Sequence, residues 1–169
     1  MSLEKAIKTA IEYETKVRDV YKKATEDTSD NTGKRVFGLL AKVEQYHLDY
    51  LNKRLNEWKE SGSVTVVKLQ TTIPSQDKIQ EGVWKLSEKM STKDFSDEIL
   101  MLRKALQVET ETSDFYEKMV SELDGDGKKL FANFLDIERG HKSLVQAEID
   151  HLQGRGYWYD FPEFDLEVQ

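Results

Sequence analysis

Two residues able to ligate a metal ion stand three positions apart in the stretch KVEQYHLDY, residues 42–50. Glu44 and His47 lie within a segment that otherwise has the apolar periodicity of a helix. Residues at i and i+3 share one helix face about one turn apart, so this carboxylate and this imidazole can reach the same ion. Because the same spacing is common on solvated helices, one instance does not identify a site.

The pair recurs at Glu138 and His141, 94 residues further along the chain. The stretch TGKRVFGLLAKVEQYH, which holds the first pair, aligns without a gap on DGKKLFANFLDIERGH, which holds the second. A further match aligns AIEYETKVRDVY on ALQVETETSDFY at an offset of 95 and sets Glu14 opposite Glu109. These nearly equal offsets indicate two copies of one helical hairpin. Paired about a pseudo-twofold axis, the copies would bring four glutamates and two histidines together in the core.

Such a core needs compensating positive charge, because an isolated buried carboxylate carries a large desolvation cost. No lysine or arginine shares the helix seams at the level of the glutamates, whereas two divalent cations would neutralise all four. The sequence therefore predicts a dinuclear metal site with the ligands Glu14, Glu44, His47, Glu109, Glu138 and His141. Carboxylates with one imidazole per ion suit iron or manganese, and zinc or cobalt also binds such donors. The absence of cysteine excludes thiolate zinc sites and iron-sulfur clusters.

Helical register gives the positions of the other polar residues relative to these seams. Tyr21 and Tyr116 follow the glutamates of the first and third helices by two turns on the same face. They can donate a hydrogen bond to a ligand carboxylate, carry an electron, or serve as ordinary core residues. Glu148 and His151 form a third pair with the same spacing, but His151 is rotated about 80° from the seam of His141 at 100° per residue. We expect this third pair on the surface.

Four long helices must position the site. Prolines occur only at 74 and 162, and the breakers leave unbroken stretches at about 3–26, 33–60, 96–123 and 126–153. Ser96 is expected to cap the third helix. The first two and the last two helices have short links, whereas about 35 residues, 61–95, separate the two pairs. We therefore expect an all-α antiparallel four-helix bundle, made of two hairpins joined by a long crossover, with a short aromatic and acidic tail at 154–169.

Length and charge limit the classes of function. A chain of 169 residues suits a single domain, here 1–153 with its tail. Lys and Arg total 25 against 32 Asp and Glu, a net charge of −7, and no basic run could track a nucleic acid. The sequence shows neither an apolar run of membrane-spanning length nor the core of a signal peptide. We expect a cytoplasmic protein that binds neither nucleic acid nor membrane.

The order Glu, Glu-x-x-His, Glu, Glu-x-x-His, with a tyrosine seven residues after the first and third glutamates, resembles the ferritin-like superfamily and specifically rubrerythrin-type di-iron proteins. The resemblance covers about residues 3–153. It implies a ferritin-like bundle with a non-haem di-iron centre that reduces hydrogen peroxide or, less well, dioxygen. It also implies the ligand roles, which are bridging for Glu44 and Glu138, terminal for Glu14 and Glu109, and one iron each for His47 and His141.

The sequence departs from the rubrerythrin pattern in two features. Rubrerythrins typically carry a further glutamate three residues after the third-helix ligand, which exchanges with a histidine in redox ligand switching. Here that position is Thr112, with Val17 as its repeat mate, so the exchanging carboxylate is absent. They also typically end in a rubredoxin domain with four cysteines, which this chain lacks, so electrons must come from a separate donor such as a rubredoxin. The tail is expected to seal the bundle end or pack on a second subunit of a homodimer or higher homo-oligomer, with donor docking as a third role.

Other functions of the same ligand set stay open at this point. If the protein is a ferroxidase that handles iron, we expect a large hollow oligomer. A manganese catalase is a more distant alternative. A structural or metal-sensing bundle would use the same ligands for folding or for partner control, without turnover.

Overall fold

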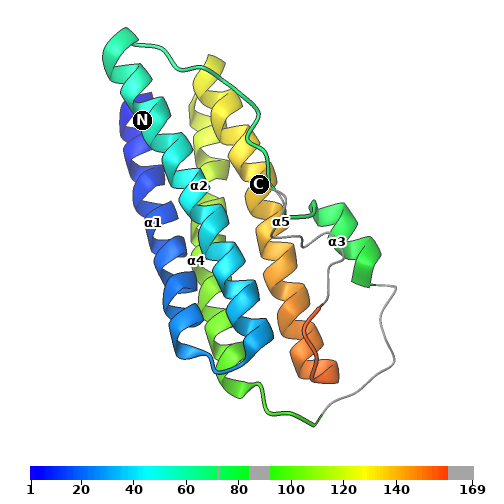
Figure 1. Cartoon of the computed structure of the whole chain (residues 1–169). Coiled ribbons are helices and arrows are strands. Elements are labelled where there is room, and N and C mark those ends of the chain that lie inside the picture. The colour runs from blue at the N-terminus through cyan, green and yellow to red at the C-terminus, as the bar shows by residue number, and fades with distance from the viewer. Residues whose placement is uncertain (72, 84–91, 160–169) are drawn as a thin grey trace.

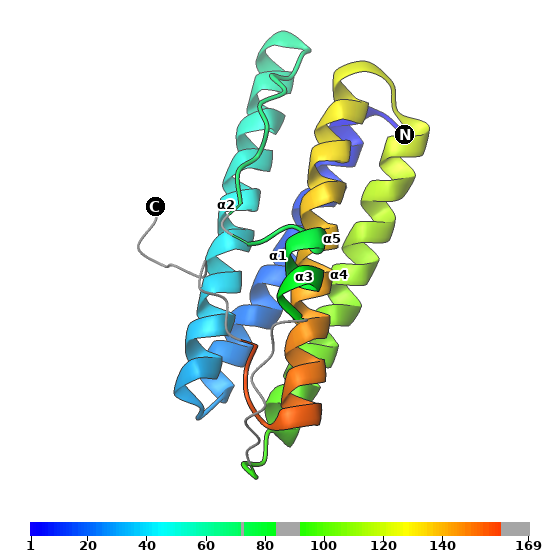
Figure 2. The same cartoon turned by 90° about the vertical axis from the view of Figure 1, so that its right-hand side faces the viewer.

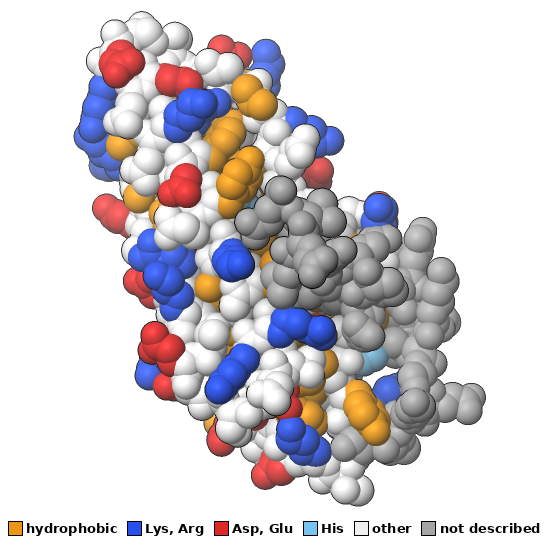
Figure 3. All heavy atoms as spheres, viewed as in Figure 1, with side chains coloured by type: hydrophobic (Ala, Val, Ile, Leu, Met, Phe, Trp, Pro, Cys, Tyr) orange, Lys and Arg blue, Asp and Glu red, His pale blue; other side chains and the backbone are white. Residues whose placement is uncertain are grey.

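The computed structural model describes residues 1–71, 73–83 and 92–159, and of residues 81–83 only the backbone. Within these residues the protein is all-α, with no strand. Its helices are α1 (Leu3–Asp27), α2 (Asn31–Ser61), α3 (Gln76–Val83), α4 (Ser96–Glu122) and α5 (Gly125–Arg155). The all-α prediction is confirmed, and the four long helices begin and end within one or two residues of the predicted bounds. None of the helices in the described ranges is long and apolar enough to cross a membrane. On the face drawn in Figure 3, Lys and Arg side chains lie among Asp and Glu side chains.

The long helices lie side by side as two hairpins (Figure 1). Helix α1 packs against α2, α4 packs against α5, and the hairpins meet mainly where α1 contacts α4. Between the hairpins, the connection leaves the far end of α2 and returns alongside α5, where the short helix α3 packs (Figures 1 and 2). The short helix α3 lies within this connection, and residues 84–91 lie outside the described part of the chain.

Local side-chain chemistry fixes the helix ends. The Asp30 carboxylate accepts a hydrogen bond from the Gly33 backbone N–H at 2.7 Å and so caps α2. At the other end, Gly62 adopts a left-handed φ of 69°, which glycine tolerates without strain. The expected cap at Ser96 is wrong, because Ser96 is the first helical residue. The N-cap residue is Phe95, which makes no side-chain capping bond, and Asp94 accepts a hydrogen bond from the Ser96 backbone N–H at 2.9 Å.

The apolar core consists of two separate clusters. One contains Tyr21, Phe37, Leu102 and Val145 among its fully buried residues. The other contains the buried residues Ile7, Leu51, Met119, Phe131 and Phe134. Along each long helix, the chain passes from one cluster to the other at the position of a predicted ligand. A polar layer therefore divides the core at one level.

The described part of the tail packs against the turn between α1 and α2. Trp158 donates from Nε1 to the Asp30 carboxylate at 2.8 Å, and its ring lies edge-on against Phe37 with centroids 5.7 Å apart. Tyr159 is buried, and its hydroxyl donates to the Ile79 carbonyl at 3.3 Å. Residues 154 and 155 belong to α5, and residues 160–169 lie outside the described ranges.

Candidate metal centre

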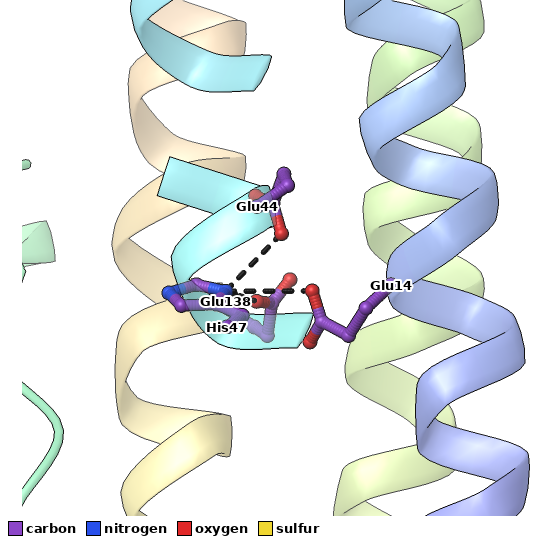
Figure 4. Close-up of side chains that lie close together, drawn as sticks. All are labelled: Glu14, Glu44, His47 and Glu138. Atoms are coloured by element: carbon purple, nitrogen blue, oxygen red, sulfur yellow. Dashed lines mark hydrogen bonds and ion pairs between the residues drawn. The ribbon is translucent and has the colours of Figure 1, made fainter. Parts of the chain in front are cut away.

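All six predicted ligands meet in the polar layer. Each long helix contributes, and every one of the six side chains has 0% exposure. They are Glu14 from α1, Glu44 and His47 from α2, Glu109 from α4, and Glu138 and His141 from α5. Figure 4 shows four of them, Glu14, Glu44, His47 and Glu138, with their polar ends directed toward one another between the helices. The structure therefore brings together the six residues that the repeat sets at one level.

One group of four residues surrounds the imidazole of His47. Its Nδ1 lies 3.1 Å from Glu44 Oε2, 3.4 Å from Glu14 Oε2 and 3.8 Å from Glu138 Oε1. One ligand atom from each of the four residues lies within 4.8 Å of the others, which is close enough for a single metal ion.

A second group surrounds His141 in the same manner. Its Nδ1 lies 2.9 Å from Glu44 Oε1, 3.7 Å from Glu109 Oε1 and 3.8 Å from Glu138 Oε1. The two imidazole rings are nearly parallel, with centroids 5.3 Å apart and planes 12° apart. Glu44 and Glu138 belong to both groups, whereas the other four residues belong to one group each. Glu44 directs one carboxylate oxygen to each histidine.

Two buried tyrosines hold the unshared glutamates. Tyr21 of α1 donates its hydroxyl to Glu109 Oε1 at 2.5 Å, and Tyr116 of α4 donates to Glu14 Oε1. Each tyrosine therefore binds the glutamate of the other hairpin. These bonds occupy one oxygen of Glu14 and one of Glu109, whereas neither oxygen of Glu138 has a hydrogen-bond partner. Of the roles that the sequence left open for the tyrosines, the structure places both as donors to the predicted ligands.

Several buried polar atoms of the centre lack a hydrogen-bond partner. Among the described residues, Glu109 Oε2, both Glu138 oxygens and the Nε2 atoms of His47 and His141 are buried without a hydrogen-bond partner, whereas Glu44 Oε1 and His141 Nδ1 form an ion pair at 2.9 Å. Buried polar atoms are nearly always partnered, and a group of such atoms from different helices needs an explanation. Two cations would satisfy them and offset the carboxylate charge, so the residues present fit a pair of metal ions.

Burial and mutual repulsion separate the pKa values of the glutamates. Burial, reinforced by the nearby charge of Glu44, raises the pKa of Glu14 to about 8. Burial also raises the pKa of Glu138 well above its usual value, with Glu109 as the largest repelling neighbour. For Glu44, burial acts in the same direction, but the two histidines outweigh it and hold its pKa well below the usual value.

The histidines respond in the opposite way. Burial alone would lower the pKa of His47, but the carboxylates of Glu44 and Glu14 outweigh burial and raise it to about 9. The pKa of His141 rises to about 10, because Glu44 and Glu109 outweigh the effect of burial. In the metal-free protein, protonated imidazoles therefore supply part of the positive charge that bound cations would provide.

The expectation that Glu148 and His151 lie on the surface is wrong. Glu148 is fully buried and His151 is 8% exposed. The tail covers them, because the Tyr159 backbone N–H donates to Glu148 Oε2 at 2.8 Å and the Tyr159 ring packs against His151 with centroids 5.0 Å apart. The rotation that separates this pair from the seam is nevertheless real, since neither residue belongs to a metal-sized group within the described part of the chain.

Sequence reasoning missed two aromatic neighbours of the centre. Phe134 lies edge-on against the His47 ring with centroids 5.6 Å apart, and Tyr50 contacts Phe134 at 5.7 Å. Phe134 stands seven residues before His141 on the same helix, but this spacing is equally typical of an ordinary core residue. Thr112, at the position of the absent extra glutamate, is fully buried and donates its hydroxyl to the Val108 carbonyl at 2.8 Å.

Comparison with models of known protein families, with curated proteins and with solved structures finds no match to this chain.

Proposed function

We propose that the protein is a ferritin-like, rubrerythrin-type di-iron redox protein that reduces hydrogen peroxide, or less well dioxygen, with electrons from a separate donor such as a rubredoxin. The observation that supports this proposal most directly is the sharing of Glu44 and Glu138 between the two groups of ligands. Two carboxylates common to two ion positions are what a dinuclear centre requires, whereas two independent mononuclear sites would not share them.

The proposed roles of the residues follow from their contacts. Glu44 would bridge, because its two oxygens face different histidines, and Glu138 would bridge because both of its oxygens are free of hydrogen bonds. Glu14 and Glu109 would be terminal ligands, since a tyrosine occupies one oxygen of each. His47 and His141 would each complete one ion position.

A diferrous centre would supply two electrons, and hydrogen peroxide needs two electrons and two protons to become two molecules of water. The protein's own residues provide the conditions for this chemistry. The fully buried ligands keep the centre away from bulk solvent, which strengthens the electrostatic interactions inside it. Tyr21 and Tyr116 hold the orientation of the terminal carboxylates. Burial raises the pKa of both tyrosine hydroxyls well above their usual value, so they remain neutral hydrogen-bond donors.

Iron is proposed because four carboxylates with two imidazoles form a hard, oxygen-rich donor set. Manganese or zinc also suits this set, and a manganese-loaded centre would favour peroxide disproportionation. The identity of the bound metal is therefore the first property to determine.

The proposal can be tested with protein purified without added metal, analysed for bound elements, and then loaded anaerobically with ferrous iron. We expect about two irons per chain and a faster oxidation by peroxide than by air-saturated buffer in stopped-flow absorbance. Glu44→Gln and Glu138→Gln should lose both iron and peroxide turnover. Glu148→Gln is the matched control, since Glu148 is equally buried on α5 but lies outside both groups. It should retain two irons and wild-type turnover.

The same measurements separate the alternatives. Many irons oxidised per chain in a large assembly would replace the peroxidase assignment with a ferroxidase. Two bound metals with only background peroxide turnover would identify a structural or sensory site. A peroxide reaction no faster than the reaction with air would contradict the proposed substrate.

A further inference from the structure

The proposed centre is closed to solvent, yet a metal ion and an oxidant must reach it. All six ligand side chains have 0% exposure. The backbone of α1 lies close to α2 and α4, and that of α4 lies close to α5, but α2 and α5 approach one another far less. The two Glu-x-x-His pairs face each other across this α2–α5 seam. The seam is therefore the side of the centre that helix backbone covers least.

The connection between the hairpins covers the seam. Figure 2 shows it descending along α2 and then crossing to the side of α5. Val64 and Leu69 pack into the core cluster on one side of the polar layer, together with Leu51 and Phe134. Ile73 packs into the cluster on the other side. Leu69 and Ile73 therefore lie on opposite sides of the level of the centre.

On the α2 side, polar contacts hold this connection. The Tyr50 hydroxyl donates to the Val67 carbonyl at 2.8 Å. Arg54, 3% exposed, donates to the Thr65 carbonyl at 2.9 Å, and the Thr65 backbone N–H donates to the Glu57 carboxylate at 3.1 Å. No helix or strand hydrogen bonds are formed within residues 63–71, so these side chains from α2 fix the segment.

On the α5 side, the connection is held by a close approach of the two backbones. The Pro74 carbonyl oxygen would lie only 3.1 Å from a Cβ atom at Gly140. Gly140 directly precedes the ligand His141. A glycine at this position lets the connection lie against α5 beside the centre, and a side chain there would push it outward.

The contact on the α2 side reaches the centre through two rings. Tyr50, which holds Val67, packs against Phe134, and Phe134 packs against the ring of the ligand His47. Release of Val67 would therefore loosen the aromatic layer beside the metal ligand as well as the cover.

We propose that residues 64–71 and 73–74 form a gate over the α2–α5 seam, through which metal ions and a small oxidant enter, with the Tyr50–Val67 hydrogen bond as its latch. This gate rests on the proposed metal centre. Segments with few backbone hydrogen bonds open locally at lower free energy than the whole fold, so the gate opens while the four long helices stay folded.

Two substitutions test the gate, each with a matched control on the same helix. Tyr50→Phe removes the latch hydrogen bond and keeps the ring, and Tyr46→Phe is its control on the exposed face of α2. Gly140→Ala pushes on Pro74, and Gly154→Ala is its control, since a Cβ there meets nothing within 4 Å. The measurement is the rate at which a ferrous chelator removes iron from the anaerobically loaded protein. We expect Tyr50→Phe to speed removal about fivefold, the effect of losing one hydrogen bond. Gly140→Ala should also speed removal, because it displaces Pro74, and the iron content should be unchanged in both variants.

Hydrogen exchange of the backbone amides of residues 64–71 provides a second readout in metal-free protein. These amides should exchange faster in Tyr50→Phe than in Tyr46→Phe, with the helices unaffected. Equal exchange in the two variants, or equal iron removal in all four variants, would overturn the gate and leave the metal centre standing. Wild-type protein that binds no iron would instead overturn the proposed function, and the exchange comparison would still decide whether Tyr50 latches the segment.

Discussion

Removing the metal should make the stability of the protein fall as the pH rises from 5 to 8. The reason is that Glu14, His47 and His141 all have pKa values raised in the folded state, to about 8, 9 and 10. A group whose pKa is raised by folding binds a proton more tightly in the folded state, so its contribution is complete below its unfolded pKa and is lost as the pH rises through its folded pKa. Glu44, with a lowered pKa, is already ionised in both states above about pH 5.

The size of the effect can be worked out for Glu14. Its pKa rises from 4.5 in the unfolded chain to about 8 in the folded one. Between pH 5 and pH 7 its carboxyl is ionised in the unfolded state and mostly protonated in the folded state, so each pH unit costs about 1.4 kcal/mol. Glu14 alone should therefore lower the free energy of unfolding by about 2.5 kcal/mol over this range. The histidines act in the same direction, mainly at higher pH.

The assay is urea denaturation of chelator-treated protein at several pH values between 5 and 8. Glu14→Gln cannot ionise, so this variant should show a shallower loss of stability with pH than wild type, by up to about 2.5 kcal/mol between pH 5 and 7. Glu12→Gln is the control, because Glu12 lies on the same helix but is exposed. A metal-free protein whose stability stays level or rises with pH, or an unchanged pH slope in Glu14→Gln, would refute the reasoning.

Three further predictions follow from named contacts. Bound metal should raise the melting temperature, and the difference between holo and apo protein should widen with pH because the ligands must lose their protons to bind. Calorimetry of both forms at pH 6 and pH 8 checks this. Equal melting temperatures of holo and apo protein at both pH values would contradict it. Tyr116→Phe and Tyr21→Phe should each destabilise the apo protein by about 1–3 kcal/mol in chemical denaturation, because each removes a buried hydrogen bond to a carboxylate. Trp158→Phe should cost about 1 kcal/mol by the same assay through loss of its bond to Asp30, and an unchanged stability would show that the tail contact contributes nothing.

Two sequence signals account for what was predictable. Periodicity of three and four residues fixed which stretches form helices, and the internal repeat identified which polar residues share a level. Glu44 alone was ambiguous, but its counterpart Glu138 at an offset of 94 removed the ambiguity. The structure gathers the six residues because corresponding seam positions of two similar hairpins must meet when the hairpins pair.

What the sequence could not show depends on contacts outside the repeat. Helical rotation correctly separated His151 from the seam of His141, but it could not reveal that Tyr159 covers His151. Likewise, Ser96 was expected to cap the third helix, but the helix begins at Ser96 itself, and the Asp94 carboxylate accepts from the Ser96 backbone N–H. The direction of the tyrosine bonds was also undetermined, since Tyr21 shares a helix face with Glu14 but reaches the glutamate of the opposite hairpin.

The division of ligands between the hairpins has a mechanical consequence. Each proposed ion position draws three ligands from one hairpin and the fourth from the other: Glu138 completes the group around His47, and Glu44 completes the group around His141. Bound ions would thus act as cross-links between α2 and α5, whose backbones approach each other far less than those of the paired helices α1 and α2 or α4 and α5. Like any chemical cross-link, they would restrict the separation of the two hairpins. The cations would therefore hold α2 and α5 together where few backbone contacts do so.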